Sequence, residues 1–122
     1  MNKNLIKQKV LEFIDGNDMT TYAQIESVFE ECDFDFKGYI KMTSQVKPAG
    51  IFWDGWNKEA CSIVRELQDE KKIKMDICPI INYMVDGTVM KLPVAKNLNF
   101  KRDHWIPVGF LSTKNNLTKE VN

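Results

Sequence analysis

An amphipathic segment that runs directly into a β-rich segment is the feature that most constrains the fold of this chain. Over residues 54–71, apolar side chains recur on one helical face at Trp56, Ala60, Ile63, Val64 and Leu67. This spacing predicts a helix with Asp54 as its N-cap. Residues 73–95 follow as two apolar runs on either side of Asp86 and Gly87. Because an Asp-Gly pair favours a tight two-residue turn, residues 53–95 are predicted to be a helix followed by a β-hairpin.

The register of this hairpin follows from the position of its turn. It pairs Val85 with Thr88, Tyr83 with Met90, and Ile81 with Leu92. Pro79 has no backbone N–H to donate, so the first strand is expected to break there.

Shorter patterns predict the remaining elements. Apolar positions at helical spacing predict a first helix over residues 4–15. Thr21 and Gln24 have the spacing of a capping box, which predicts that a second helix begins there. Residues 33–51 are the least regular stretch: residues 39–42 fit a short strand, residues 46–50 fit a turn, and the whole stretch fits an extra strand, a short helix or a functional loop. Residues 104–110 fit a final short strand or docking segment.

Length and composition predict one soluble domain. The chain has 122 residues, of which 43% are hydrophobic and 28% are charged, and this is enough to bury a single core. We expect a domain over residues 1–111 and a flexible polar tail over residues 112–122. The N-terminal segment mixes charges into its apolar positions, unlike a secretory signal, and no run is long and apolar enough to span a bilayer. Three widely spaced cysteines favour the reducing cytoplasm, and no membrane association is expected.

The predicted helix and hairpin carry a family resemblance. A helix that ends in ELQDEKKI and enters a hairpin resembles the recognition helix and wing of winged-helix proteins. The resemblance implies an α+β fold with three helices and a C-terminal β-hairpin wing. In that family the helix lies in a groove of DNA and the wing contacts the backbone, although some members only dock to proteins. Residues 33–51 depart from the family, which has a short turn between helices two and three.

A looser resemblance rests on the size of the chain, the GIFWDGW segment and the HWIPVGF end. These features resemble small winged-helix accessory proteins encoded beside polymerase, primase and helicase genes on bacterial mobile genetic elements. Some of those proteins bind single-stranded DNA weakly and act as subunits of replication or priming complexes.

Charge is unevenly distributed along a chain whose formal net charge is zero. Residues 11–35 contain eight acids and no base, whereas residues 71–122 contain nine bases and four acids. Such a bipolar surface would offer a basic face to phosphates and an acidic face to a protein partner. The alternative is that these charges only solvate helices and strands.

Two basic groups are candidates for contact with nucleic acid. Lys58 and Arg65, with Ser62 between them, occupy the outward face of the third helix, where nearby acids would repel a duplex. The second group combines bases with an aromatic ring, a mixture typical of single-strand binding. It comprises Lys72, Lys74, Tyr83, Lys91, Lys96, Lys101 and Arg102. Alternatively, Tyr83 packs in the sheet and the lysines protect a strand edge.

An acidic group is the candidate partner-binding surface. It comprises Glu30, Glu31, Asp33 and Asp35 at the end of the second predicted helix. Among Phe52, Trp53 and Trp56, two are expected to anchor the core, and an exposed one would become a partner hot spot or a base-stacking platform.

The sequence contains no signature of catalysis, and no cofactor or small-molecule substrate is expected. Cys32, Cys61, Cys78 and His104 lack the close ligand spacing of structural zinc sites. The single histidine has no nucleophile near it in sequence, and no glycine-rich phosphate loop is present. We therefore expect a non-enzymatic, winged-helix protein that binds single-stranded DNA weakly inside a larger replication complex with a polymerase or helicase. The alternatives are a protein-binding adaptor or inhibitor and a transcription regulator.

Overall fold

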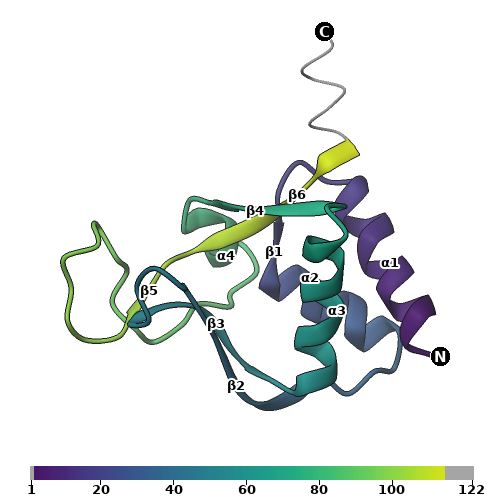
Figure 1. Cartoon of the computed structure of the whole chain (residues 1–122), viewed down its shortest axis with the longest axis horizontal. Helices are drawn as coiled ribbons and strands as arrows, with labels where there is room; N and C mark the ends of the chain where they lie inside the picture. The colour runs from purple at the N-terminus through teal and green to yellow at the C-terminus, as the bar shows by residue number, and fades with distance from the viewer. Residues whose placement is uncertain (1, 115–122) are drawn as a thin grey trace, which may run out of the picture.

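The computed structural model describes residues 2–114, and their fold is α+β, as the sequence predicts. Four helices and two small sheets make up this part of the chain (Figure 1). In chain order the elements are α1 (Lys3–Asp15), β1 (Thr20–Thr21), α2 (Tyr22–Glu31), β2 (Lys37–Thr43), β3 (Gly50–Trp56), α3 (Lys58–Asp69), β4 (Ile73–Ile77), α4 (Ile81–Met84), β5 (His104–Trp105) and β6 (Val108–Ser112).

Side-chain caps explain where the first three helices begin. Asn2 accepts a hydrogen bond from the backbone N–H of Leu5 at the start of α1. The capping box predicted at Thr21 and Gln24 is confirmed, because both of its reciprocal hydrogen bonds are present at the start of α2. Asn57 caps α3 by accepting from the N–H of Ala60.

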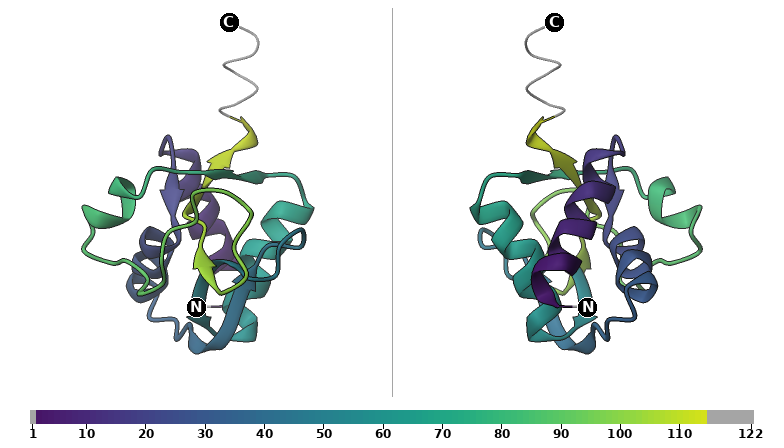
Figure 2. Two further views of the ribbon diagram at one scale, coloured as in Figure 1. Left: turned by 90° about the vertical axis from the view of Figure 1, so that its left-hand side faces the viewer. Right: turned by 90° about the vertical axis from the view of Figure 1, so that its right-hand side faces the viewer.

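The two sheets divide the molecule into two parts. One sheet is antiparallel with the strand order β1-β6-β4, and it packs with α1, α2 and α3; we call this the helical part. The other has the order β2-β3-β5, in which β2 and β3 form an antiparallel hairpin and β5 runs parallel to β3. With residues 85–103, named the long connection, this second sheet forms the arm. The two side views of Figure 2 place α1 at one end of the molecule and the long connection at the other.

An aromatic core joins the helical part to the arm. Trp56 from β3 is fully buried, and its ring lies edge-on against Phe29 of α2 and Tyr22. The indole N–H groups of Trp56 and Trp53 both donate to one carboxylate oxygen of Glu26, at 2.9 and 2.8 Å. Two of the three clustered aromatic residues therefore anchor the core, as the sequence predicts, while Phe52 is half-buried.

The third predicted helix begins later than expected. Residues 53–56 belong to strand β3, and α3 begins at Lys58 with Asn57 as its N-cap in place of Asp54. Gly55 adopts a φ of 88°, which is incompatible with a continuous helix from Asp54. The buried stripe of α3 (Ala60, Ile63, Val64 and Leu67) is as predicted, but Trp56 reaches the core from the strand.

The hairpin predicted at Asp86 and Gly87 is wrong. Strand β4 pairs with β6 instead of with a strand after Gly87. The Asp86-Gly87 dipeptide marks the end of helix α4. Gly87, at a φ of 67°, donates to the carbonyl of Met84, and Thr88 donates to that of Tyr83; these bonds form a Schellman motif after α4. Asp86 lacks the positive φ that a type I′ turn requires. Strand β4 ends before Pro79, in line with the predicted break.

The predicted boundary of the tail is also corrected. Ser112 ends strand β6, is buried, and donates a hydrogen bond of 2.6 Å to the carboxylate of Asp15. It therefore belongs to the domain and not to a tail. Residues 115–122 of the expected tail lie outside the described residues. No helix among residues 2–114 has the length and apolar character needed to cross a membrane.

Candidate nucleic-acid interface

The predicted basic residues lie in separate places because the predicted wing hairpin does not form. Lys72 and Lys74 lie beside the start of β4, next to α3, and the remaining group lies on the long connection (Figure 1). That group comprises Lys91, Lys96, Lys101 and Arg102, all of them exposed. The structure therefore brings these four residues onto the arm and leaves Lys72 and Lys74 on the helical part.

Backbone hydrogen bonds fix the long connection to the arm. Trp105 of β5 donates to the carbonyl of Pro93 at 2.8 Å and accepts from the N–H of Ala95 at 2.9 Å. His104 donates through its backbone N–H to Ala49, beside the start of β3, at 2.9 Å. Both ends of the basic segment are thereby held against the second sheet, so its four cations project from a defined support.

The β2–β3 hairpin adds three lysines that the sequence interpretation missed, Lys37, Lys41 and Lys47. Over residues 37–56 and 85–106 the arm then has seven bases and three acids, a net charge of +4. Lys41 forms an exposed ion pair of 3.5 Å with Asp103, and the ammonium of Lys47 lies 5.2 Å from the centre of the Phe100 ring. The three lysines themselves were the available signal, but residues 39–42 are predicted only as a short strand with no partner, so they are not joined to the basic group.

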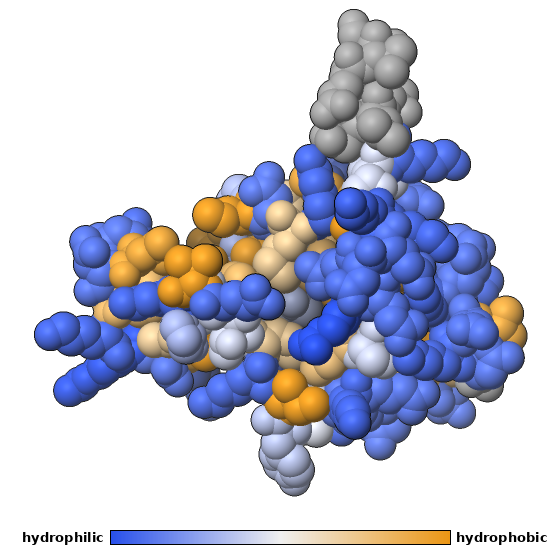
Figure 3. Space-filling model, in the orientation of Figure 1, coloured by the Kyte–Doolittle hydropathy of each residue, from blue (hydrophilic) through white to orange (hydrophobic). Residues whose placement is uncertain are grey.

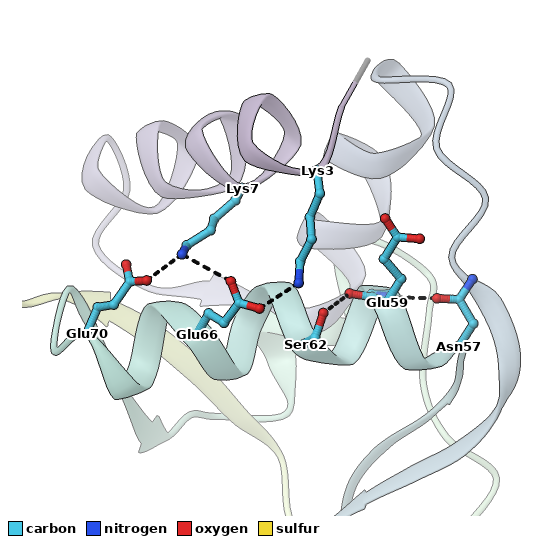
Figure 4. A network of polar contacts seen from close by, with 8 residues as sticks. Lys3, Lys7, Asn57, Glu59, Ser62, Glu66 and Glu70 are labelled. Carbon is cyan, nitrogen blue, oxygen red and sulfur yellow. Dashed lines mark hydrogen bonds and ion pairs between the residues drawn. The ribbon is translucent and has the colours of Figure 1, made fainter.

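The outward face of α3 is less acidic than its sequence indicates. Lys3 and Lys7 reach across from α1 and bind Glu66 and Glu70 of α3, as Figure 4 shows. Hydrogen bonds from these lysines lower the pKa of both carboxyl groups. On the side turned away from α1, Lys58 and Arg65 are exposed, so the two predicted α3 bases are surface residues.

Ser62 does not present its hydroxyl group as predicted. It donates to the backbone carbonyl of Glu59 at 2.7 Å (Figure 4). The Glu59 side chain is exposed and follows Lys58 in the sequence. Of the three residues predicted to contact nucleic acid on α3, only the two bases, Lys58 and Arg65, remain available, and acids lie among them.

Arg65 lines a groove between α3 and strand β2, with a volume of about 590 Å³. Sulfur-bearing side chains contribute to its walls, and the Sγ atom of Cys61 lies 3.4 Å from the Sδ atom of Met42. Lys41 lies on the opposite wall. The groove thus places one base from the helical part and one from the arm on its two sides.

The prediction that Tyr83 binds nucleic acid is wrong. It lies on α4 and is fully buried, with its ring 4.9 Å from that of Trp105. Its hydroxyl group donates to the carbonyl of Val108 at 2.6 Å and accepts from the N–H of Tyr22 at 3.2 Å. Burial raises the pKa of this hydroxyl group. The ring therefore stabilises the core and is not on the surface to stack on a base.

The four predicted partner-binding acids remain together. Glu30, Glu31, Asp33 and Asp35 are all exposed around the end of α2. Three of them border a shallow hollow of about 340 Å³, with Phe34, Phe36 and Lys37. Over residues 22–36 there are five acids and no base. This acidic group lies at the α1 end of the molecule, whereas the cations of the long connection lie at the other (Figures 1 and 2).

Cysteines and histidine form no ligand set in the part of the chain that the structure describes, where no group of three or more His, Cys, Asp or Glu residues is placed to hold a metal ion. Cys32, Cys61 and Cys78 are unpaired thiols. Burial raises the pKa of the Cys78 thiol to about 11.

An exposed apolar patch around α4 was not predicted, because these residues were assigned to a strand. Ile77, Ile81, Met84 and Val85 are between 54% and 77% exposed. In Figure 3, apolar side chains gather on the side where α4 and the long connection lie, while hydrophilic side chains cover α1 and α3. Exposed apolar side chains gathered in this way are typical of an interaction surface.

Comparisons of the chain with protein-family models, with curated proteins and with solved structures found no match.

Proposed function

We propose that this chain is a winged-helix domain that binds single-stranded DNA weakly through its arm and works as a subunit of a DNA replication or priming complex. The winged-helix assignment is supported by three helices followed by the antiparallel pair β4 and β6. In this assignment the β2–β3 hairpin is an insertion between α2 and α3, and residues 78–107 enlarge the wing.

The observation that carries the proposal is the charge of the arm. Seven bases and three acids lie on it, and no ion pair within residues 2–114 involves Lys91, Lys96, Lys101 or Arg102. Cations that are not already paired release the counterions of a phosphate backbone at little cost, so binding to the arm is expected to depend on salt.

A single strand fits this surface better than a duplex. The helix that reads a DNA groove in winged-helix proteins corresponds to α3, where Glu59 and Asp69 are exposed beside Lys58 and Arg65. Those acids would repel the two closely spaced backbones of a duplex groove. The arm begins beside the start of α3 and carries most of its bases on the long connection, and a single strand can follow such an irregular surface because its backbone is flexible.

A charge-reversal pair tests the proposal. Lys96→Glu combined with Lys101→Glu should weaken binding of a labelled single-stranded oligonucleotide at low salt by roughly tenfold or more, and should flatten the salt dependence. Fluorescence anisotropy, recorded from about 20 to 200 mM salt, measures both effects. The matched control is Lys9→Glu with Lys71→Glu, which changes the net charge equally on the helical part.

The comparison of the two double variants decides the outcome. Equal weakening in both would show that only net charge matters, and the arm would then lose its assigned role. No salt-dependent binding by the unmodified protein, to single-stranded or duplex DNA, would overturn the proposal itself.

The apolar patch supports the second half of the proposal, membership of a larger complex. Ile81 and Met84 belong to it, and the exposed residues Asp76 and Asp86 are next to Ile77 and Val85 in the sequence. Acids next to an apolar patch disfavour the binding of phosphates. We therefore assign this patch to contact with a protein subunit such as a polymerase or helicase. Ile81→Glu with Met84→Glu should abolish co-purification with the products of neighbouring genes and leave oligonucleotide binding unchanged. Retained co-purification would remove the patch from the proposal.

A second candidate function, that of a protein-binding adaptor or inhibitor, rests on the four exposed acids at the end of α2. They are exposed and lie apart from the cations of the long connection, which leaves them open to a basic partner. Replacing Glu30, Glu31, Asp33 and Asp35 by their amides should then abolish partner binding. The double variant at Lys96 and Lys101 should bind that partner normally, which is the reverse of what the main proposal predicts for DNA.

A further inference from the structure

Tyr39 on strand β2 is fully exposed. Its relative exposure is 100%, whereas the other two tyrosines are at most 2% exposed. A tyrosine ring has a large apolar surface, and leaving all of it in water forgoes the free energy that burial would provide. The exposure of this ring therefore needs a structural explanation and indicates a functional role.

The cause is a β-bulge beside a glycine that has no room for a side chain. Lys37 and Ile40 both pair with Trp56 of β3, so Gly38 and Tyr39 are extra residues in the ladder. A Cβ atom on Gly38 would lie 2.6 Å from the Cα atom of Asn57 and 2.7 Å from the carbonyl oxygen of Trp56. The strand backbone thus lies directly against the start of α3, and the bulge turns the next side chain outward.

Hydrogen bonds on both sides hold this segment in place. The N–H of Asn57 donates to the carbonyl of Phe36 at 2.7 Å, and the Asn57 amide group donates to the carbonyl of Asp35 at the same distance. Phe36 itself is buried. Tyr39 is therefore presented by a bulge tied to the N-cap of α3, and not by a long loop.

Two lysines flank the bulge along the backbone. Lys37 precedes it by two residues, and Lys58 follows Asn57, whose backbone touches Gly38. Both ammonium groups are on exposed side chains. The acids nearby are Asp35, whose carboxylate accepts the backbone N–H of Lys37 at 3.1 Å, and Glu59 on α3. Glu30 and Asp33 line the same hollow as Lys37.

We propose that Tyr39 is a base-stacking platform for single-stranded nucleic acid, with Lys37 and Lys58 placed to contact the flanking phosphates. This inference rests on the proposed function and names a contact residue that lies outside the predicted site. An aromatic face with cations beside it is the combination that binds single strands with little sequence preference. A duplex keeps its bases stacked on one another and offers no face to the ring.

The surroundings favour a base over a protein as the occupant. Hot spots of protein interfaces lie at the centre of well-packed apolar surface. Tyr39 stands instead on a bulge bordered by charged residues, and its apolar neighbour on β2, Ile40, is only 39% exposed. The exposed apolar patch of this protein is elsewhere, around α4.

Three single variants test the inference with an oligothymidine and a duplex of equal length. Tyr39→Ala should weaken single-strand binding roughly 5- to 150-fold, the range that corresponds to stacking of one base. Tyr39→Phe, which keeps the ring, should bind nearly as the unmodified protein does. Val46→Ala is the control, because Val46 is 84% exposed on the same hairpin and away from the bulge. Thermal unfolding should be unchanged in all three variants, since these side chains are largely or fully in solvent.

The outcomes separate this inference from the proposed function. If the unmodified protein binds no oligonucleotide, both are overturned. If it binds with the expected salt dependence and Tyr39→Ala binds equally well, only the stacking role is overturned. Equal weakening of single-strand and duplex binding, or loss of a protein partner with oligonucleotide binding intact, would also overturn it.

Discussion

The helical part and the arm are built on different principles. Strand β6 of the helical part is buried at four of its five residues, and its register with β4 is regular. Strand β2 of the arm has no buried residue, and its register with β3 shifts three times. The arm stays in place because tryptophans from β3 and β5 insert into the core. We therefore propose a division in which the helical part provides most of the buried framework and the arm, apart from its core tryptophans, provides surface chemistry.

The largest effect is expected where the two parts meet. Trp56→Ala removes a fully buried ring that contacts Tyr22, Phe29 and Phe36 of the helical part. Such a truncation lowers the free energy of unfolding by about 3–5 kcal/mol. Urea unfolding followed by circular dichroism measures the loss. If the arm were an independent unit, the loss would instead be small and the helical signal would unfold at its original midpoint.

A smaller effect is expected at the carboxylate that joins the parts. Glu26→Ala leaves the indole N–H groups of Trp53 and Trp56 without their acceptor. Each donor left unsatisfied costs about 1–3 kcal/mol when it is buried, and the half-burial of Glu26 places the expected loss near the lower value. Glu26→Gln retains an acceptor oxygen and should lose less. Equal losses in the two variants, measured by urea unfolding, would show that the charge and not the hydrogen bonding matters.

The contrast between the helical part and the arm also explains which features of the fold could be predicted from the sequence. Local signals identify the helical part: the capping box at Thr21 and Gln24 involves residues three apart, and the stripe from Ala60 to Leu67 covers two turns. These patterns give the fold class and three of the helices. The strand that pairs with β4 is β6, which lies more than 30 residues away in the chain, and no local pattern identifies it.

Signals with two meanings explain most of the errors. An Asp-Gly pair fits a hairpin turn or a helix end, and only the tertiary position of α4 decides between them. Tyr83 has a ring that fits both a core and a binding surface, and its burial depends on distant Val108 and Trp105. In the arm, Tyr39 and its bulge depend on contact between Gly38 and Asn57, so the sequence alone does not identify them.

The Schellman motif at the start of the long connection can be tested directly. Gly87→Ala places a Cβ atom at a φ of 67°, so the free energy of unfolding should fall by about 1 kcal/mol. Asp86→Ala should change it by less than about 0.5 kcal/mol, because Asp86 lacks a positive φ and its side chain is exposed. Thermal unfolding of both variants measures the difference. Comparable losses would favour a hairpin turn, which strains both positions.

The smallest effect is expected from the ion pairs on the helical part. Lys7→Met removes the partner that lowers the pKa of Glu70 and, together with Lys3, that of Glu66. A lowered carboxyl pKa stabilises the folded protein above the ordinary glutamate pKa of about 4.3, and this contribution is lost as the pH falls through the lowered value. The unmodified protein should therefore unfold at slightly higher urea than the variant at pH 7, and at the same urea once the pH is below both pKa values.

The control for this prediction is Lys9→Met, which removes only a long, exposed ion pair with Glu12 within α1 and should leave the pH dependence unchanged. Oligonucleotide binding should be the same in both variants, because neither lysine belongs to the arm. A midpoint difference for Lys7→Met that persists at low pH would assign the role of Lys7 to the packing of its aliphatic chain between α1 and α3. Weaker DNA binding in that variant would instead extend the contact surface onto the helical part, and the division of stability from surface chemistry would no longer hold.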